Sequence, residues 1–209
     1  MINLIGLAAQ KQNGKDTLAD YLLDRHLVKW DRRAWADGLK KTVSEVFGVD
    51  RYFIEEWKEN PEPPPGWSIT MRKCLQFVGD GMRQVKGDCW LEYTTRDRQA
   101  STIITDGRYL NELAKIKELG GFNLLVYRPG FLNDIDHPSE SQLRPVVEFF
   151  VERKWHGRVR FKTDQFAQQQ AVPEGADYID YVIWNDGDII QLRKKVDEFV
   201  LSLLFGDQK

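Results

Sequence analysis

Short apolar runs alternate with longer amphipathic stretches along most of the chain. The runs are typical of strands buried on both faces of a sheet, and they cover residues 2–9, 27–36, 101–106, 122–127 and 181–184. Helical spacing of apolar residues predicts helices over 16–26, 37–47, 111–119 and 189–205. This strand–helix–strand order predicts an α/β fold with a central parallel sheet of about five strands joined by right-handed crossovers.

Two more helices are predicted between the second and third strands. One begins with Ser68 as its N-cap, and the other follows Asp88. Gly48 should end the helix before them. In the helices of this region we expect burial of the apolar side chains Leu39, Val43, Val46, Phe47, Met71, Leu75, Phe77, Val78, Trp90, Leu91 and Tyr93.

Two segments show neither the apolar runs of a strand nor the apolar spacing of a helix. Residues 50–67 are charged, aromatic and proline-rich, so they predict an irregular loop or flap without regular helix. Residues 131–177 are polar, rich in Gln and Arg, and hard to place in a sheet. Loops of that length are usually functional lids or disordered segments.

The turn after the first predicted strand has the residues of a phosphate-binding loop. Gln10 to Gly14 lead directly into Lys15 and a helix. Amide groups at such a turn point at an anion, glycine permits close approach, and lysine adds positive charge. The sequence departs from G-x-x-x-x-G-K-[ST], since Ala9 replaces the first glycine and Asp16 the hydroxyl residue. A carboxylate there is best explained as a Mg²⁺ ligand, with Thr17 bonding a phosphate. The alternative is a surface turn with Asp16 favouring the helix N-terminus.

Charged residues follow several of the predicted strands. In a parallel sheet the carboxyl ends of the strands form the ligand-binding edge, and here they lead to Lys40, Asp106, Arg108, Arg128 and Asn185. Asp106 could hold a Mg²⁺-bound water, and the two arginines could clamp phosphoryl oxygens. Each has an alternative: Asp106 as a helix cap, Arg128 or Lys40 as a solvated charge.

Other residues with candidate roles lie outside the strand ends. Arg72 and Arg83 are either helix-surface charges or holders of an acceptor phosphate, while Trp90 fits a core residue better than a stacking platform. His137 fits a lid residue better than a catalytic base, because phosphoryl transfer depends mainly on positioning and charge neutralisation.

Composition narrows the class of protein. The chain has 209 residues, 42% of them apolar, which fits one globular domain, with or without an inserted lobe. A net charge of −2 argues against a protein that coats nucleic acid. Two cysteines and three histidines do not suggest a zinc cluster or disulfide scaffold, and they favour a reducing cytosol. No membrane span or signal peptide is predicted, so a cytoplasmic location is expected.

The ordered motifs resemble the deoxynucleoside monophosphate kinases of tailed bacteriophages, relatives of the P-loop nucleoside monophosphate kinases. The matching pieces are NGKDT at 13–17, WADGLK at 35–40, MRKCLQ at 71–76 followed by Gly79, Arg83 and Trp90, ITDGRYLNE at 104–112, RP at 128–129, HPSE at 137–140 and NDG at 185–187. Their shared order, rather than any single motif, carries the resemblance.

The resemblance implies a single three-layer P-loop domain over 1–209, with an acceptor-binding region at 37–100 and a lid or insertion at 130–178. It implies phosphoryl transfer from ATP, with Mg²⁺, to a deoxynucleoside 5′-monophosphate in the cytoplasm of a phage host. The ATP-binding residues would be Asn13, Gly14, Lys15, Asp16, Thr17 and Asn185, with Asp16 and Asp106 at the metal. The acceptor residues would be Asp37, Lys40, Arg72, Gln76, Arg83, Asp106 and Arg108, and the catalytic residues Lys15, Asp16, Arg108 and Arg128.

Three departures from the family pattern and two rival functions remain. Ala9 and Gly38 replace family glycine and proline, and 144–176 has the look of an insertion, so that Arg144, Arg153, Arg158 and Arg160 belong either to a closing lid or to a surface lobe. The rivals are a nucleotide-binding regulator without chemistry and a nucleic-acid-processing protein. We expect no membrane association and no stable nucleic-acid binding. The preferred base and the oligomeric state, including a possible homodimer, stay open.

Overall fold

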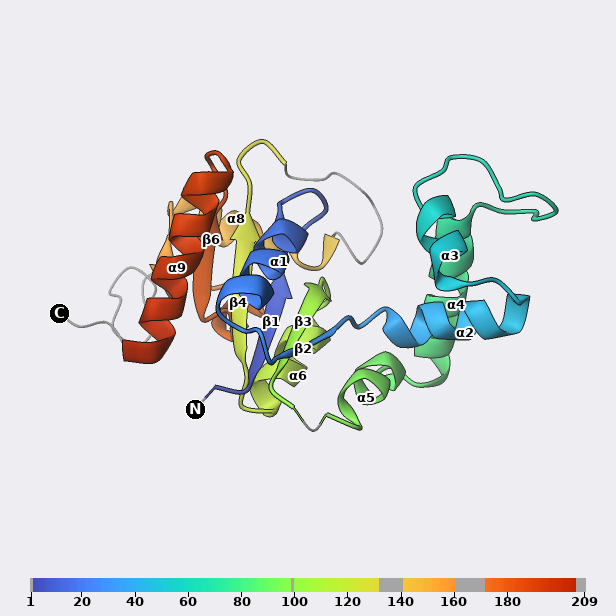
Figure 1. Ribbon diagram of the computed structural model, residues 1–209, viewed down its shortest axis with the longest axis horizontal. Helices are drawn as coiled ribbons and strands as arrows, with labels where there is room; N and C mark the ends of the chain where they lie inside the picture. Colours follow the sequence, from blue (N-terminus) through green and yellow to red (C-terminus); the bar gives the residue numbers. More distant parts are fainter. Residues whose placement is uncertain (1, 99, 132–140, 161–171, 206–209) are drawn as a thin grey trace. The chain divides into compact units, whose positions relative to one another are not determined.

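The computed structural model describes residues 2–98, 100–131, 141–160 and 172–205. The chain divides into two compact units (Figure 1). Unit 1 comprises residues 1–33 and 99–209, and unit 2 comprises residues 34–98. Each unit is described by itself below.

The described strands of unit 1 form one sheet in the order β2-β3-β1-β4-β6-β5. They are β1 (Leu4–Ala8), β2 (Asp31–Arg33), β3 (Thr102–Gly107), β4 (Phe122–Tyr127), β5 (Gly157–Arg158) and β6 (Tyr181–Trp184). All pairings are parallel except that of β5 with β6, which is antiparallel. The predicted parallel α/β sheet is confirmed, with one added edge strand.

Helices cover both faces of this sheet. One core packs α1 (Lys15–Arg25) and α9 (Ile189–Phe205) against the sheet through side chains such as Leu18, Leu22, Val196 and Phe199. A second core packs α6 (Leu110–Glu118), α8 (Arg144–Glu152) and the short 3₁₀ helix η1 (Ala176–Tyr178) against sheet residues including Leu125 and Val182. Two separate cores about one sheet give the predicted three layers.

Unit 2 is helical in its described part. It consists of α2 (Asp37–Phe47), α3 (Arg51–Trp57), α4 (Met71–Val85) and α5 (Cys89–Thr95), packed around Leu39, Val43, Ile54, Met71, Cys74 and Trp90. Trp90 is 6% exposed, and its indole N–H donates to the carbonyl of Gly79 at 3.2 Å. The interpretation of Trp90 as a core residue is therefore confirmed.

The structure corrects three of the predicted secondary-structure assignments. Residues 51–57 form α3 rather than an irregular loop, because Asp50 caps the helix by accepting from Phe53 N at 2.7 Å and Ile54 is fully buried. Thr70, not Ser68, caps α4. Residues 157–158 join the sheet as β5, where a pattern of two residues is too short to read from sequence.

Three predicted core residues are exposed. Phe77 is 70% exposed because the buried stripe of α4 runs through Met71, Cys74 and Gly79, and position 77 lies off that stripe. Val46 and Phe47 are 71% and 48% exposed at the end of α2, where the Phe47 ring lies against the ring of Trp67, with ring centroids 4.8 Å apart.

Candidate active site

The turn between β1 and α1 has the backbone of an anion-binding loop. Gln12 and Gly14 adopt positive φ values of 66° and 87°, and Gly14 is the N-cap of α1. The first intrahelical bond runs from Leu18 N to Gly14 O at 3.1 Å. Amide groups of the first helical turn therefore have no partner within the helix and lie at the positive end of its dipole.

Asn13 holds this loop from inside. Its side chain is 1% exposed, and its amide nitrogen lies 3.2, 3.1 and 3.2 Å from the carbonyl oxygens of Gln10, Lys11 and Phe131. Its amide oxygen accepts from Arg128 N at 2.5 Å. The loop is thus tied to the segment that leaves β4. Asn13 is a predicted ATP-binding residue, and its side chain here positions the loop backbone.

Asn185 reaches the same loop from the end of β6. Its side-chain amide donates to Asn13 O at 3.1 Å, and its backbone N–H donates to Tyr127 O at 2.7 Å. A Cβ added at Gly14 would lie 2.3 Å from Asn185 Nδ2. Glycine at position 14 is therefore required both by its backbone conformation and by this close neighbour.

The end of β3 also meets the loop. Ala8 pairs with Gly107, and Ala9 N donates to Gly107 O at 3.3 Å. A Cβ at Gly107 would lie 3.0 Å from the carbonyl oxygen of Leu7. Ala9 has no positive φ, so alanine in place of the first motif glycine strains nothing. Asp106, the residue before Gly107, accordingly comes from the strand that borders the loop.

Arg108 is fixed through its main chain by a buried carboxylate. Glu112, 5% exposed, accepts from Arg108 N at 2.7 Å and from Tyr109 N at 3.0 Å. A glutamate at the third position of a helix that bonds the preceding amides is the capping-box arrangement. Glu112 therefore sets the path of the chain between Asp106 and α6.

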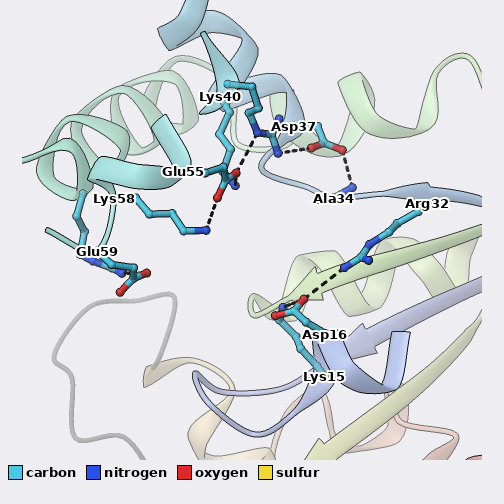
Figure 2. A network of polar contacts seen from close by, with 11 residues as sticks. Lys15, Asp16, Arg32, Ala34, Asp37, Lys40, Glu55, Lys58 and Glu59 are labelled. Atoms are coloured by element: carbon cyan, nitrogen blue, oxygen red, sulfur yellow. Dashed lines mark hydrogen bonds and ion pairs between the residues drawn. The ribbon is translucent and has the colours of Figure 1, made fainter. Parts of the chain in front are cut away.

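Lys15 and Asp16 form an ion pair at the start of α1 (Figure 2). Lys15 Nζ lies 2.8 Å from Asp16 Oδ1, with 12% of the Lys15 side chain exposed against 67% for Asp16. Arg32 from β2 approaches the same carboxylate at 3.5 Å and pairs with Asp20 at 2.5 Å. Thr17 is exposed on the same helical turn. A nucleotide phosphate at the loop would meet two cations, Lys15 and Arg32, whose carboxylate partners Asp16 and Asp20 are both exposed.

Arg128 is exposed, and its guanidinium lies 4.4 Å from the centre of the Phe131 ring. Its backbone is held by Asn13, as described above. The side chain is therefore supported on an aromatic face, which limits its conformations without consuming its hydrogen-bond donors.

The carboxylate oxygens near the loop are suitable ligands for a hard divalent cation. Within the described residues, no group of three or more His, Cys, Asp or Glu side chains gathers as a metal cluster. Mg²⁺ is usually held by one or two carboxylates together with substrate phosphates and water. Asp16 at the loop and Asp106 on the neighbouring strand offer oxygen donors of that kind, so the residues fit a metal that arrives with the nucleotide.

Most of the predicted acceptor residues lie in unit 2. Asp37 begins α2 and accepts from Ala34 N at 2.7 Å and from Arg51 at 3.0 Å, while Lys40 pairs with Glu55 at 2.6 Å (Figure 2). Arg72 is paired with Glu59 at 2.5 Å. Further along α4, Gln76 is half-buried and Arg83 donates to Asp80 at 3.0 Å. Unit 2 thus holds five of the predicted acceptor residues. Unit 1 holds the other two, Asp106 and Arg108, together with the predicted ATP-binding residues.

Glycine at position 38 has a local cause. A Cβ there would lie 2.6 Å from the Tyr93 ring. The helices α2 and α5 therefore approach closely at this point, and the proline of the resembling family would not fit against Tyr93 in this packing.

The described part of the 144–176 range is packed into unit 1. The apolar side chains of α8 are buried in the second core, and the arginines make local contacts. Arg144 pairs with Glu148 at 2.7 Å, Arg153 lies over the Phe149 ring, and Arg158 donates to Ser202 O at 3.3 Å. His137 and residues 161–171 lie outside the described residues.

Sequence reasoning missed four sets of contacts. They are the ion pair of Arg32 with Asp16, the hydrogen bond from Arg108 N to Glu112, the ion pairs of Arg51 and Lys58 with Glu55, and the ion pair of Glu59 with Arg72. Only Glu112 carried a readable signal, as a glutamate three positions after a helix start. The others depend on tertiary packing of long side chains that periodicity does not reveal.

Within the described residues, no helix combines the length and hydrophobicity that a membrane crossing needs. A glycine-and-lysine turn between the first strand and its helix, at the carboxyl edge of a largely parallel sheet covered on both faces, gives the chain the three-layer α/β fold of P-loop proteins.

No protein-family model matches the sequence. The chain is 34% identical over 168 residues to the "Putative deoxynucleotide monophosphate kinase" of Acanthamoeba polyphaga mimivirus, covering 71% of this chain and 86% of that protein. The chain belongs to the deoxynucleotide monophosphate kinase family.

Two solved structures align over the full length of this chain. Dephospho-CoA kinase from Campylobacter jejuni has 13% identity, a TM-score of 0.42 and 100% of its own chain covered. Shikimate kinase from Acinetobacter baumannii, in complex with shikimate, has 12% identity, a TM-score of 0.44 and 97% of its chain covered. At this level of similarity neither structure bears on the substrate.

Proposed function

We propose that the protein transfers the γ-phosphoryl group of ATP to deoxynucleoside 5′-monophosphates, giving the diphosphates used in DNA precursor synthesis. A phage or other viral origin and action in the host cytoplasm fit this role. The main support is the Asn13–Gly14–Lys15 turn, which is hydrogen-bonded to Arg128 N after β4 and to the Asn185 side chain after β6. It follows Ala9, whose N–H donates to Gly107 O at the end of β3. Membership of the deoxynucleotide monophosphate kinase family supports the acceptor class.

We assign the phosphoryl donor, ATP, to the loop of unit 1. Amides of the first α1 turn and Lys15 would bind the β- and γ-phosphates, and Thr17 would bond a phosphate oxygen. Asn185 lies against the loop from β6, and its neighbourhood would hold the adenine. A bound Mg²⁺, held by Asp16 and Asp106 with the phosphates, would neutralise charge on the transferring group.

The acceptor is assigned mainly to unit 2. Asp37, Lys40, Arg72, Gln76 and Arg83 would bind it, while Arg108 and Arg128 of unit 1 would contact the transferring phosphoryl group. Transfer needs the acceptor oxygen in line with the γ-phosphorus, so positioning and charge neutralisation supply most of the rate. Exclusion of water would limit ATP hydrolysis.

A coupled ADP-release assay with the individual deoxynucleoside and ribonucleoside monophosphates tests this proposal. We expect turnover with at least one deoxynucleotide, little ADP release without an acceptor, and loss of turnover when Mg²⁺ is omitted. ATP binding without turnover across the whole panel would contradict the proposal and favour a regulator. Binding to DNA that weakens steeply with salt, again without turnover, would favour a nucleic-acid-processing protein.

A further inference from the structure

One carboxylate in unit 2 is surrounded by three cations (Figure 2). Glu55 Oε1 accepts from Lys40 Nζ at 2.6 Å and from Arg51 Nε at 3.0 Å, and Glu55 Oε2 accepts from Lys58 Nζ. Arg51 also donates to Asp37. We call Lys40, Arg51 and Lys58 the cation cluster. It joins the start of α2 to α3 and the residue that follows α3.

The cation cluster carries more positive charge than its carboxylates offset. Three cations face two carboxylates, Glu55 and Asp37. The pKa of Lys40 is lowered, first by burial and then by the nearby charge of Lys58 and Arg51, against the opposing effect of Glu55. Positive charges held close together in a partly buried place favour the arrival of a further anion.

The cluster is also accessible from solvent. The Lys40 side chain is 15% exposed, but Lys58 and Arg51 are 34% and 48% exposed. An anion could therefore reach the two outer cations without unfolding of either helix. Planar guanidinium and ammonium donors converging on one point are the usual means of binding phosphate.

Arg72, another predicted acceptor residue, is covered in the same way. Its guanidinium pairs with Glu59, which lies four positions after Glu55 in the same segment. Carboxylates at 55 and 59 therefore occupy cations at two of the predicted acceptor positions, Lys40 and Arg72.

We propose that the cation cluster binds the 5′-phosphate of the acceptor nucleotide, and that Glu55 occupies the cluster as a substitute anion until the phosphate displaces it. This inference rests on the proposed function for the identity of the acceptor. It adds Arg51 and Lys58 to the phosphate-binding residues, and it makes Glu55 a residue that opposes binding rather than one that contacts substrate favourably.

Protonation of Glu55 does not free the cation cluster at physiological pH. Burial raises the pKa of Glu55, but hydrogen bonds from Lys40, Lys58 and Arg51 outweigh burial and lower it to about 2. Glu55 therefore stays a carboxylate at any physiological pH. A dianionic phosphate carries twice its charge and can compete with it for the same donors.

The first test compares Glu55→Gln with Glu56→Gln. Glu56 is the adjacent residue on α3, is exposed and forms no ion pair within the described chain, so its substitution removes the same charge without touching the cluster. We expect Glu55→Gln to lower the KM for the deoxynucleotide about fivefold, because a competing charge near the phosphate is removed. Glu56→Gln should leave the KM within about twofold of wild type.

An unchanged or raised KM in a folded Glu55→Gln variant would overturn the inference, since a purely structural ion pair predicts no gain. Arg51→Gln supplies the opposite variant and should raise the KM for the acceptor while leaving the KM for ATP unchanged. Equal effects on both substrates would also contradict the assignment.

A second measurement needs no variant of Glu55 and no turnover. Inorganic phosphate is titrated into the wild-type protein while the Arg51 Nε–H signal is followed by NMR, with Arg51→Lys used to assign it. We expect a saturable shift that is absent for Arg96, an exposed arginine of unit 2 that pairs with neighbouring Asp97. No shift at Arg51 overturns the inference. A shift at Arg51 in a protein that phosphorylates no nucleotide would retain the anion site and reject the proposed function.

Discussion

The two units build their candidate binding residues in different ways. In unit 1 the candidate phosphate-binding loop is formed by main-chain groups, and its shape is held by the buried side-chain amide of Asn13 and by contacts with the residues that follow β4 and β6. In unit 2 the cation cluster is formed by the ends of long, partly exposed side chains around Glu55. The first arrangement is preorganised by the fold. The second can rearrange through side-chain rotation alone.

This difference suggests a division of work. A preorganised loop suits a donor whose phosphates must be placed accurately for in-line transfer. An adaptable cluster suits an acceptor that must enter, react and leave in each cycle. Substitutions in unit 1 should therefore act through the loop geometry, and those in unit 2 through charge.

Lys15→Met should have the largest effect. The variant removes the cation nearest the predicted phosphates, so we expect a loss in kcat of about 10²–10³-fold. The thermal midpoint should hardly change because the Lys15 ion pair is with exposed Asp16. Lys29→Met, an exposed lysine of the same unit, is the control and should behave as wild type. A Lys15→Met variant with near-normal turnover would remove the lysine from the mechanism.

Asn13→Ala should be next in size. It leaves buried carbonyl groups of the loop without their donor, so we expect a loss of at least about 2 kcal/mol in the free energy of unfolding. The KM for ATP should rise with it. Asn13→Asp keeps the acceptor for Arg128 N but removes both donors, and urea unfolding of the two variants separates the contributions. A stable Asn13→Ala protein with unchanged KM would show that the loop shape does not depend on this amide.

Gly14→Ala tests the loop against a matched site in unit 2. Gly14 and Gly48 both have positive φ, but only Gly14 has a neighbour, Asn185, within reach of a Cβ. Each substitution should cost about 1 kcal/mol for the backbone conformation. Only Gly14→Ala should also raise the KM for ATP, because Asn185 must move away from the loop. Equal kinetic effects of the two substitutions would contradict the assignment of the donor site.

The pH dependence of unit 2 should show the smallest effect. Glu55 has its pKa lowered from 4.5 to about 2 in the folded protein, so its stabilising contribution is present above pH 4.5 and is lost as the pH falls through about 2. Because 36% of the Glu55 side chain is exposed, solvent screens its ion pairs and the contribution should be below about 1 kcal/mol. Urea midpoints from about pH 6 to about pH 2 should fall less steeply for Glu55→Gln than for Glu56→Gln. Parallel curves would contradict the role given to the ion pairs.

The sequence predicted unit 1 better than unit 2 for a physical reason. The strands β1, β3, β4 and β6 are largely apolar because both faces of the sheet are covered, and the turn at 10–15 must satisfy backbone geometry that few residue types allow. Such constraints leave a strong local pattern. The strand ends around the loop could be predicted because parallel strands bring their carboxyl ends to one edge.

The contacts of unit 2 left a weaker pattern. Helix α3 spans seven residues, and one buried residue, Ile54, anchors it, so its periodicity is too short to recognise. The pairing of Lys40 with Glu55 spans fifteen positions between two helices and depends on how α2 packs on α3. Phe77 shows the converse error, since its residue type suggested burial while its position on α4 exposes it.

Quenched-flow transfer from γ-labelled ATP to a panel of deoxynucleoside monophosphates tests the central claim most directly, because it follows the phosphoryl group itself. We predict that the label appears in a deoxynucleoside diphosphate with wild-type protein and not with Lys15→Met. Label that appears only in inorganic phosphate, or remains in ATP with every acceptor, would contradict the account.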